Sequence, residues 1–157
     1  MNYYDTISEG YDELHREEQE KKISLIKEYF PIEKSDKLLD LGSGPGFAEF
    51  DCDVYRIDPS KKLLEKADGK KTLAFAENLP YPDNTFDKVI SITAMQNFHD
   101  IKTAVAEMKR VCKGKFALSF LKKSSKKEYI EEILNEEFAV EKNINEEKDI
   151  IIIANYK

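Results

Sequence analysis

The stretch K-L-L-D-L-G-S-G-P-G-F, Lys37 to Phe47, decides how this chain folds. Its first five residues are typical of a short buried strand, and glycine then recurs at positions 42, 44 and 46. A glycine-rich turn directly after a buried strand lets the backbone approach a ligand closely, because no Cβ stands in the way. We expect the N–H groups of this loop to be free and to hold an anionic or polar part of that ligand.

A second apolar run, Val54 to Ile57, ends in Asp58, eighteen residues after Asp40. An ionised carboxylate has two acceptor oxygens, so at the end of a strand it can bind both hydroxyls of a ribose. The order strand, glycine loop, strand, acid therefore indicates a cofactor that contains a nucleoside. The other interpretation of Asp58 is a cap for the helix that follows it.

The spacing of the loop separates three kinds of cofactor site. A phosphate-binding P-loop requires Lys and then Ser or Thr after its last glycine, whereas Phe47 and Ala48 follow here. A dinucleotide loop, G-x-G-x-x-G, requires its third glycine one residue after Gly46. The pattern D-x-G-x-G-x-G fits at every position, starting from Asp40. In this respect the sequence resembles the class I S-adenosylmethionine-dependent methyltransferases.

Three further segments resemble the ubiquinone/menaquinone-biosynthesis-like (methyltransferase type 11) branch of that family: Tyr11 to His15, Ala76 to Ser91 and Ala104 to Lys115. The resemblance implies an α/β fold, a Rossmann-like doubly wound sheet of seven strands in the order 3-2-1-4-5-7-6, with strand 7 antiparallel. It implies one methyltransferase domain over residues 1–157, of which residues 1–30 form an N-terminal lid and helix. It also implies an enzyme that uses S-adenosyl-L-methionine and releases S-adenosyl-L-homocysteine.

The apolar periodicity and the turn residues predict where the elements lie. We expect a loop or short helix over residues 1–10, and strands over 37–41, 54–57, 72–76, 86–93, 115–120, 138–143 and 149–156, the last two forming a hairpin. Helices are expected over 16–30, 60–67, 101–113 and 126–135, with Asp100 and Gly114 at the two ends of the third. Only Gly46 to Cys52 remains for the first crossover, where we expect one or two helical turns.

The resemblance also assigns roles to residues. It implies that Asp40 orients the loop and the methionine amino group, that Gly42 and Gly44 admit the methionine part, and that Asp58 binds the ribose. The family often has an Asp where this chain has Phe75, so we expect adenine to be recognised by packing against Phe75 and by the backbone of Ala76. The remaining expected cofactor contacts are Ser43, Gly46, Pro59, Glu77 and Thr93.

The sulfonium of this cofactor is already activated, so we expect neither a nucleophilic residue nor a metal. The protein has to hold the methyl group in line with the acceptor and exclude water. A general base is required only for a weakly acidic acceptor such as a hydroxyl, and His99 and Tyr11 are the candidates. The aromatic residues Tyr3, Tyr4 and Tyr11, together with His15, are candidate substrate contacts; the alternative is aromatic packing and a surface histidine.

Composition limits the acceptor and the compartment. The net charge of -6 provides no overall basic field for nucleic acid, which favours a small-molecule acceptor. Cys52 and Cys112 are isolated in the sequence, and we expect free thiols in a cytoplasmic protein. The polar start of the chain does not resemble a signal peptide, and its longest apolar run is too short to cross a membrane.

Other functions stay open. The first is the catalytic subunit of an rRNA or tRNA methyltransferase that needs a small activator protein. Ile90 to Gln96 resembles the eukaryotic ribosomal-RNA guanine-N7 methyltransferases, and the lysines at 122, 123, 126 and 127 can bind phosphates or belong to a solvated loop. The absence of Asn-Pro-Pro-Tyr argues against amide and exocyclic-amine acceptors. The second is a non-catalytic cofactor-binding protein. The third is a nicotinamide oxidoreductase, and the spacing of the glycine loop argues against this third function.

Overall fold

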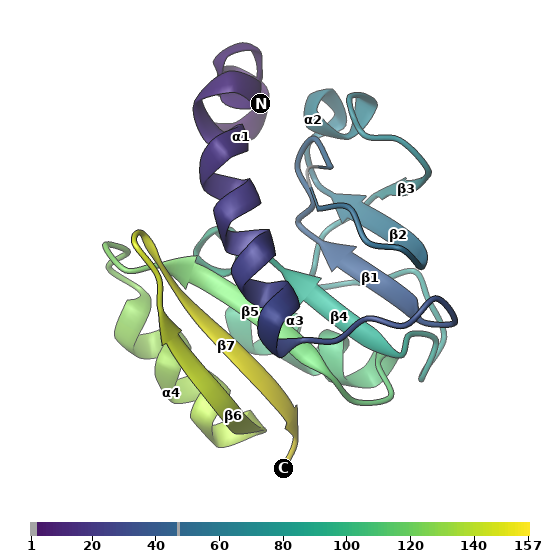
Figure 1. The fold of residues 1–157 in the computed structure, drawn as a ribbon, viewed down its shortest axis with the longest axis vertical. Coiled ribbons are helices and arrows are strands. Elements are labelled where there is room, and N and C mark those ends of the chain that lie inside the picture. Colours follow the sequence, from purple (N-terminus) through teal and green to yellow (C-terminus); the bar gives the residue numbers. More distant parts are fainter. Residues whose placement is uncertain (1–2, 47) are drawn as a thin grey trace.

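The protein is built on one seven-stranded sheet with the strand order β3-β2-β1-β4-β5-β7-β6 (Figure 1). A computed structural model describes residues 3–46 and 48–157, and for residues 3–15 it describes the backbone alone. β1 to β5 run parallel, whereas β7 is antiparallel to both β5 and β6. The fold expected from the sequence is confirmed. The strands are β1 (Lys37–Leu41), β2 (Asp53–Asp58), β3 (Lys70–Leu73), β4 (Lys88–Ser91), β5 (Phe116–Leu121), β6 (Phe138–Asn145) and β7 (Asp149–Tyr156).

Helices cover the two faces of the sheet unequally. The long α1 (Tyr3–Tyr29) crosses one face, and α3 (Ile101–Val111) and α4 (Lys127–Glu137) cover the other (Figure 1). The short α2 (Lys61–Glu65) follows β2, and a 3-10 turn, η1 (Met95–Asn97), follows β4. Because β1 to β5 are parallel, their carboxyl ends lie at one edge of the sheet, where ligands bind in open α/β folds.

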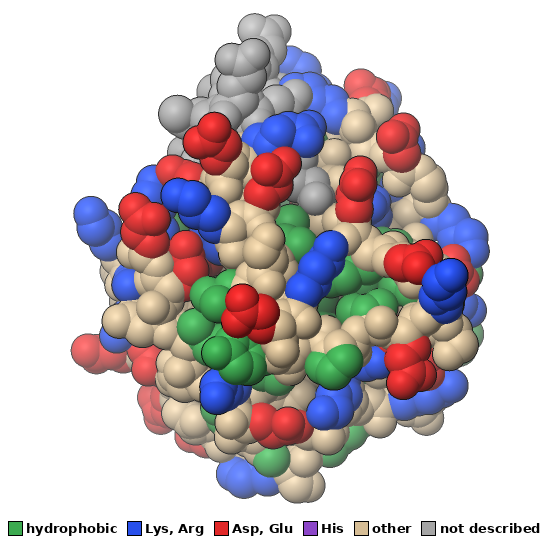
Figure 2. Space-filling view, viewed as in Figure 1, with side chains coloured by type: hydrophobic (Ala, Val, Ile, Leu, Met, Phe, Trp, Pro, Cys, Tyr) green, Lys and Arg blue, Asp and Glu red, His purple; other side chains and the backbone are tan. Residues whose placement is uncertain are grey.

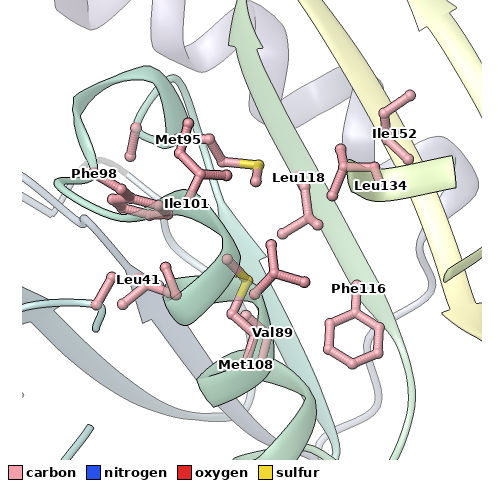
Figure 3. Close-up of a cluster of buried hydrophobic side chains, with 14 of the residues drawn as sticks. Leu41, Val89, Met95, Phe98, Ile101, Met108, Phe116, Leu118, Leu134 and Ile152 are labelled. Atoms are coloured by element: carbon pink, nitrogen blue, oxygen red, sulfur yellow. The ribbon is translucent and has the colours of Figure 1, made fainter. Parts of the chain in front are cut away.

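The larger core lies between the sheet and α3 with α4. α3 contributes side chains at helical spacing, and Met108 packs with Val89 of β4 and Phe116 of β5 in this core (Figure 3). The side chain of Asp100 accepts a hydrogen bond from the Thr103 N–H and thereby caps α3, as predicted. This core holds the carboxyl ends of β1 and β4 in fixed register.

A smaller core lies on the opposite face, under α1. Ile23 and Ile26 of α1, and Phe30 just after it, pack against Leu38 of β1 and Ile90 of β4. The central strands β1, β4, β5 and β7 are buried on both faces and are mostly apolar, whereas the edge strands β3 and β6 are largely exposed. α1 therefore rests directly on the middle of the sheet.

The structure corrects the expected element boundaries in several places. Residues 3–10 belong to the same helix as residues 16–29 and form neither a loop nor a separate helix. The described residues 46 and 48–52 contain no helix, whereas one or two turns were expected there. β3 ends at Leu73, so Phe75 and Ala76 lie in the loop beyond it. α3 ends at Val111, and Gly114, with φ +144°, belongs to the turn before β5 and not to the helix terminus.

Candidate cofactor-binding site

A pocket of about 260 Å³ opens at the carboxyl ends of β1, β2, β3 and β4. All four strands contribute to it through the residues at or just after their last position. Its lining includes nine of the residues that the sequence singled out. They are Gly42, Gly44, Asp58, Pro59, Phe75, Ala76, Glu77, Thr93 and His99.

The glycine loop is closed by its own hydrogen bonds. The N–H groups of Gly42 and Ser43 both donate to the carbonyl oxygen of Ile57, at 2.9 and 3.0 Å, and the Gly46 N–H donates to the Ser43 carbonyl at 3.0 Å. The Gly44 N–H donates to Asp58 Oδ2 at 2.8 Å. The expectation of free N–H groups in this loop is therefore wrong for these four residues, since β2 accepts from three of them and the loop itself accepts from the Gly46 N–H.

Glycine at position 42 is required by both conformation and space. Gly42 has φ +74°, and a Cβ added to it would lie 2.6 Å from the Cβ of Ala94. Gly46 has φ +80°, and its added Cβ would lie 3.0 Å from the Cβ of Ala67. The loop is therefore pressed between the end of β4 on one side and the end of α2 on the other.

Asp58 holds the loop and faces the pocket at the same time. Its Oδ2 accepts from the Gly44 N–H and its Oδ1 accepts from the Ser60 N–H, each at 2.8 Å. Ser60, and not Asp58, is the N-cap of α2, because its hydroxyl accepts from the Leu63 N–H. A carboxylate oxygen can accept more than one hydrogen bond, and Asp58 also lines the large pocket.

Asp40 lies opposite an arginine on the neighbouring strand. Asp40 of β1 and Arg56 of β2 are register partners, and Arg56 Nη1 lies 2.8 Å from Asp40 Oδ2. Burial raises the pKa of Asp40 to about 7, although the charge and hydrogen bond of Arg56 act in the opposite direction. Asp40 therefore changes its charge near neutral pH and is sensitive to any cation placed next to it.

A second, small cavity of about 20 Å³ lies between α1 and the glycine loop. Asp40, Gly42 and Ser43 line it from the sheet, and Gln19 lines it from α1. Only 7% of Gln19 is exposed, and its Oε1 has no hydrogen-bond partner in the described part of the chain. A cavity of this size has room for one ammonium group or one water molecule, and its lining includes the side-chain acceptors of Asp40 and Gln19.

The opposite end of the large pocket is aromatic. The rings of Phe75 and His99 lie 5.5 Å apart in an edge-to-face arrangement, and Phe75 is 51% exposed at the rim. Oε2 of Glu77 accepts from the Asp100 N–H at 2.9 Å and so connects the loop after β3 to the start of α3. This end presents flat apolar surface that suits a heterocyclic base.

Thr93 forms part of the pocket wall in an unusual backbone conformation. It lies two residues after the end of β4 and has φ +55°. For a β-branched residue this region costs on the order of 1–3 kcal/mol and persists only where the surroundings impose it. One of the groups that hold Thr93 in this conformation is Lys22 of α1, whose Nζ donates to Thr93 Oγ1 at 3.0 Å.

The structure thus brings most of the predicted site together and separates a few members. Asp40 and Ser43 line the small cavity and not the large pocket, and Gly46 supports the loop from outside both. The side chains of Tyr3, Tyr4, Tyr11 and His15 lie outside the described residues. Sequence reasoning missed Gln19 and Arg56. The signal for Arg56 was a charged residue inside an apolar strand, and the signal for Gln19 was its position one turn before the buried stripe of α1.

This geometry defines a class of protein: a Rossmann-like domain with a nucleoside-cofactor site at the carboxyl edge of its sheet. A family model described as a methyltransferase domain matches residues 39–118. The chain therefore belongs to the S-adenosylmethionine-dependent methyltransferase family, as the sequence predicted.

Relatives with curated names agree with this assignment. The demethylmenaquinone methyltransferase of Thermotoga maritima is 30% identical over 141 residues, which cover 77% of this chain and 60% of the relative. The malonyl-[acyl-carrier protein] O-methyltransferase of Halorhodospira halophila is 28% identical, over 74% of this chain and 45% of the relative. The chain thus spans about half the length of these two curated relatives.

Solved structures share the fold at low sequence identity. A protein of Haloferax volcanii in complex with the Trm112 methyltransferase activator has a TM-score of 0.83 and 16% identity, with 99% of this chain and 98% of that chain covered. A SAM-dependent methyltransferase from Aquifex aeolicus has a TM-score of 0.73 and 18% identity, with 86% and 89% covered. Among the described residues, no helix has the length and hydropathy that a membrane span requires.

Proposed function

We propose that this protein is an enzyme that transfers the methyl group of S-adenosyl-L-methionine to a small-molecule acceptor. The observation that carries the proposal is the pairing of Asp58 with a glycine loop whose described N–H groups are all used internally. The amides of Gly42, Ser43, Gly44 and Gly46 are thus not left for a phosphate, whereas Asp58 lines the pocket and offers carboxylate oxygens to the two hydroxyls of a ribose. A nucleoside cofactor without phosphates needs no loop amides and has a ribose for Asp58 to bind.

The proposed cofactor spans the two cavities. Asp58 and Pro59 would hold its ribose, and Phe75, Ala76 and Glu77 would hold its adenine, with His99 as a second ring beside Phe75. Its methionine part passes the closely packed Gly42. Asp40 and Gln19 would hold its ammonium group in the small cavity, where Gln19 Oε1 has no hydrogen-bond partner among the described residues.

In this arrangement the chemistry is a single displacement. When bound, the cofactor would supply an activated methyl group: a lone pair of the acceptor would form a bond to the methyl carbon while the carbon–sulfur electron pair returned to sulfur, which would leave the neutral thioether S-adenosyl-L-homocysteine. The chain's own residues orient the cofactor and exclude water. An acceptor that has to lose a proton passes it to a base, for which His99 at the pocket mouth and Tyr11 of the N-terminal segment are the proposed candidates.

A small-molecule acceptor is favoured by the surface charge. Lys, Arg, Asp and Glu are interspersed on the face that carries α1, without a large patch of one sign among the described residues (Figure 2). The two named relatives bear the names of enzymes for different small or carrier-bound acceptors. We further propose that residues 1–157 act as one domain with residues 1–30 as its lid and helix, and that the free thiols suit the cytoplasm.

A second candidate is an RNA methyltransferase subunit that requires a small activator protein. The observation in its favour is the structural likeness, over nearly the full length of both chains, to the Haloferax volcanii protein in complex with an activator. The lysines after β5 add little support for this candidate, because three of them already have partners within the protein. Lys122 and Lys126 donate to the backbone carbonyls of Glu147 and Gln96, and Lys127 pairs with Glu131. These lysines are engaged by the protein itself.

Calorimetric titration tests the cofactor. S-adenosyl-L-homocysteine should bind at micromolar concentration, and NAD should not bind, because its pyrophosphate requires free loop amides. Binding of NAD in preference to S-adenosyl-L-homocysteine would overturn the proposal.

Incubation with methyl-labelled cofactor and either a small-metabolite extract or total RNA then separates the two acceptor classes. A small-molecule acceptor predicts label in the small-metabolite fraction. Label only in RNA, with a small protein co-purifying, would establish the second candidate instead.

A further inference from the structure

The inward stripe of α1 changes from apolar to polar where it reaches the carboxyl edge of the sheet. Ile23, Ile26 and Phe30 are buried over the middle of the sheet, but the preceding positions of the same stripe are Gln19 and Lys22. Only 2% of Lys22 is exposed. A lysine is almost never buried to this extent unless it is paired, so its partners identify what it is for.

Lys22 reaches two side chains that are far from it in sequence. Its Nζ lies 3.1 Å from Oδ1 of Asp149, the first residue of β7, which is fully buried. The same Nζ donates to Oγ1 of Thr93 at 3.0 Å. Thr93 Oγ1 in turn donates to Asp149 Oδ2 at 2.6 Å. The three groups close a triangle between α1, β7 and the end of β4.

This triangle extends to fix every polar atom of Thr93. Ser119 of β5 donates from its Oγ to Asp149 Oδ2 at 2.9 Å and accepts from the Thr93 N–H at 2.7 Å. Gln96 Nε2 donates to the Thr93 carbonyl oxygen at 2.8 Å. The amide, the carbonyl and the hydroxyl of Thr93 are therefore all held, and three of these four bonds involve Asp149 or one of its partners Lys22 and Ser119.

A held Thr93 has a consequence for the pocket. Its φ of +55° is a conformation that a β-branched residue abandons unless its surroundings impose it. Thr93 and the next residue, Ala94, both line the large pocket, and Ala94 is the residue that packs against Gly42. Release of Thr93 would therefore move the wall against which the glycine loop rests.

We propose that Lys22 and Asp149 are positioning residues for the cofactor: they hold Thr93 in its left-handed conformation and make the shape of the pocket depend on the seating of α1. An ion pair between Lys148, in the turn before β7, and Glu18 attaches the same part of α1 to the same corner of the sheet. The inference rests on the proposed function, because it states how this chain shapes the site for its cofactor. The alternative is that the buried pair stabilises the fold alone.

Lys22→Met, measured against S-adenosyl-L-homocysteine by calorimetry, separates these two roles. The positioning role predicts at least tenfold weaker binding by protein that is still folded. It also predicts that adding Thr93→Gly restores most of the affinity, because glycine adopts positive φ without help from Lys22. Should Lys22→Met not yield folded protein, Asp149→Asn tests the same network from its other end, with the same expected loss and the same rescue.

Lys88→Met is the matched control. Lys88 and Asp36 form another largely buried lysine–aspartate pair, but at the opposite end of the sheet, far from the pocket. This variant should lose stability and keep the affinity of the unmodified protein. Equal affinities for Lys22→Met and Lys88→Met, each accompanied only by a lower melting temperature, would overturn the positioning role.

Amide hydrogen exchange gives a readout that does not depend on any ligand. In Lys22→Met the Thr93 amide should exchange at least tenfold faster relative to the amides of β5, and in Lys88→Met this ratio should not change. An unchanged ratio in Lys22→Met overturns the inference whether or not the cofactor binds. Failure of the unmodified protein to bind S-adenosyl-L-homocysteine, with the exchange ratio raised as expected, instead contradicts the proposed function and leaves the control of Thr93 by Lys22 established.

Discussion

Gly42→Ala is the substitution whose effect the structure determines most completely. The new Cβ would lie 2.6 Å from the Cβ of Ala94, well inside the roughly 3.5–4.0 Å at which carbon atoms pack. The backbone at φ +74° adds a cost of about 1–2 kcal/mol for a residue with a Cβ. Overpacking of a closed site adds about 1–3 kcal/mol. After an offset of about 0.4–1 kcal/mol from the stiffer unfolded chain, we expect a loss of roughly 2–4 kcal/mol.

Gly69→Ala isolates the backbone part of this cost. Gly69 has φ +84°, and nothing lies within 4 Å of its added Cβ, so this variant should lose only about 1 kcal/mol. The assay is urea unfolding, with stability taken from the midpoint at an unchanged slope. In the same experiment, Ala94→Gly introduced into Gly42→Ala removes the clashing atom and should restore the overpacking part.

Binding provides the second half of this prediction. Gly42→Ala pushes the loop and Ala94 apart at the pocket wall, so S-adenosyl-L-homocysteine should bind at least tenfold more weakly, or about 1.4 kcal/mol. Gly69 lies outside the pocket, and its variant should bind normally. If Gly42→Ala were no less stable than Gly69→Ala, or if Ala94→Gly restored nothing, the close approach of these two segments would be refuted.

Two further predictions concern the small cavity. Burial raises the pKa of Asp40 to about 7, so its contribution to the free energy of unfolding is present at low pH and is lost as pH rises through about 7. A bound ammonium group favours the ionised form of Asp40, so S-adenosyl-L-homocysteine should bind more tightly as pH rises through 7, and its binding should release a proton. Calorimetry in buffers of different ionisation enthalpy would detect that proton. An affinity that does not change with pH would show that the ammonium group is not next to Asp40. Gln19→Leu should weaken S-adenosyl-L-homocysteine about tenfold and leave 5′-methylthioadenosine, which lacks the amino-acid part, unaffected; equal losses for both ligands would place Gln19 away from the ammonium group.

The sheet was predictable because its signals are local. The apolar strand before Gly42 and the acid after the second strand predict two parallel strands with a ligand loop between them, and the hairpin of β6 and β7 follows from two apolar runs a few residues apart. The cap of α3 at Asp100 is likewise written into neighbouring residues. The order of the remaining strands followed from the family resemblance, not from periodicity.

The parts of the site that were not predictable depend on residues far apart in sequence. The amides of Gly42 and Ser43 look free in the sequence, and only the pairing of β1 with β2 shows that the Ile57 carbonyl accepts both. Lys22 looks like one of many solvated lysines on a charged helix, and its partner Asp149 lies at the other end of the chain. Burial and pairing of this kind follow from tertiary packing, which periodicity does not encode.

The most direct test of the account is the affinity of Asp58→Asn for S-adenosyl-L-homocysteine, measured beside Asp53→Asn. Both residues lie on β2, but Asp53 pairs with Lys70 at the exposed start of the strand, where a surface ion pair contributes at most about 1 kcal/mol. Asp58 holds the Gly44 amide and faces the pocket. We predict micromolar binding by the unmodified protein and by Asp53→Asn, and a loss of about a hundredfold in Asp58→Asn. Equal affinity in all three proteins would contradict the assignment of this edge of the sheet as the cofactor site.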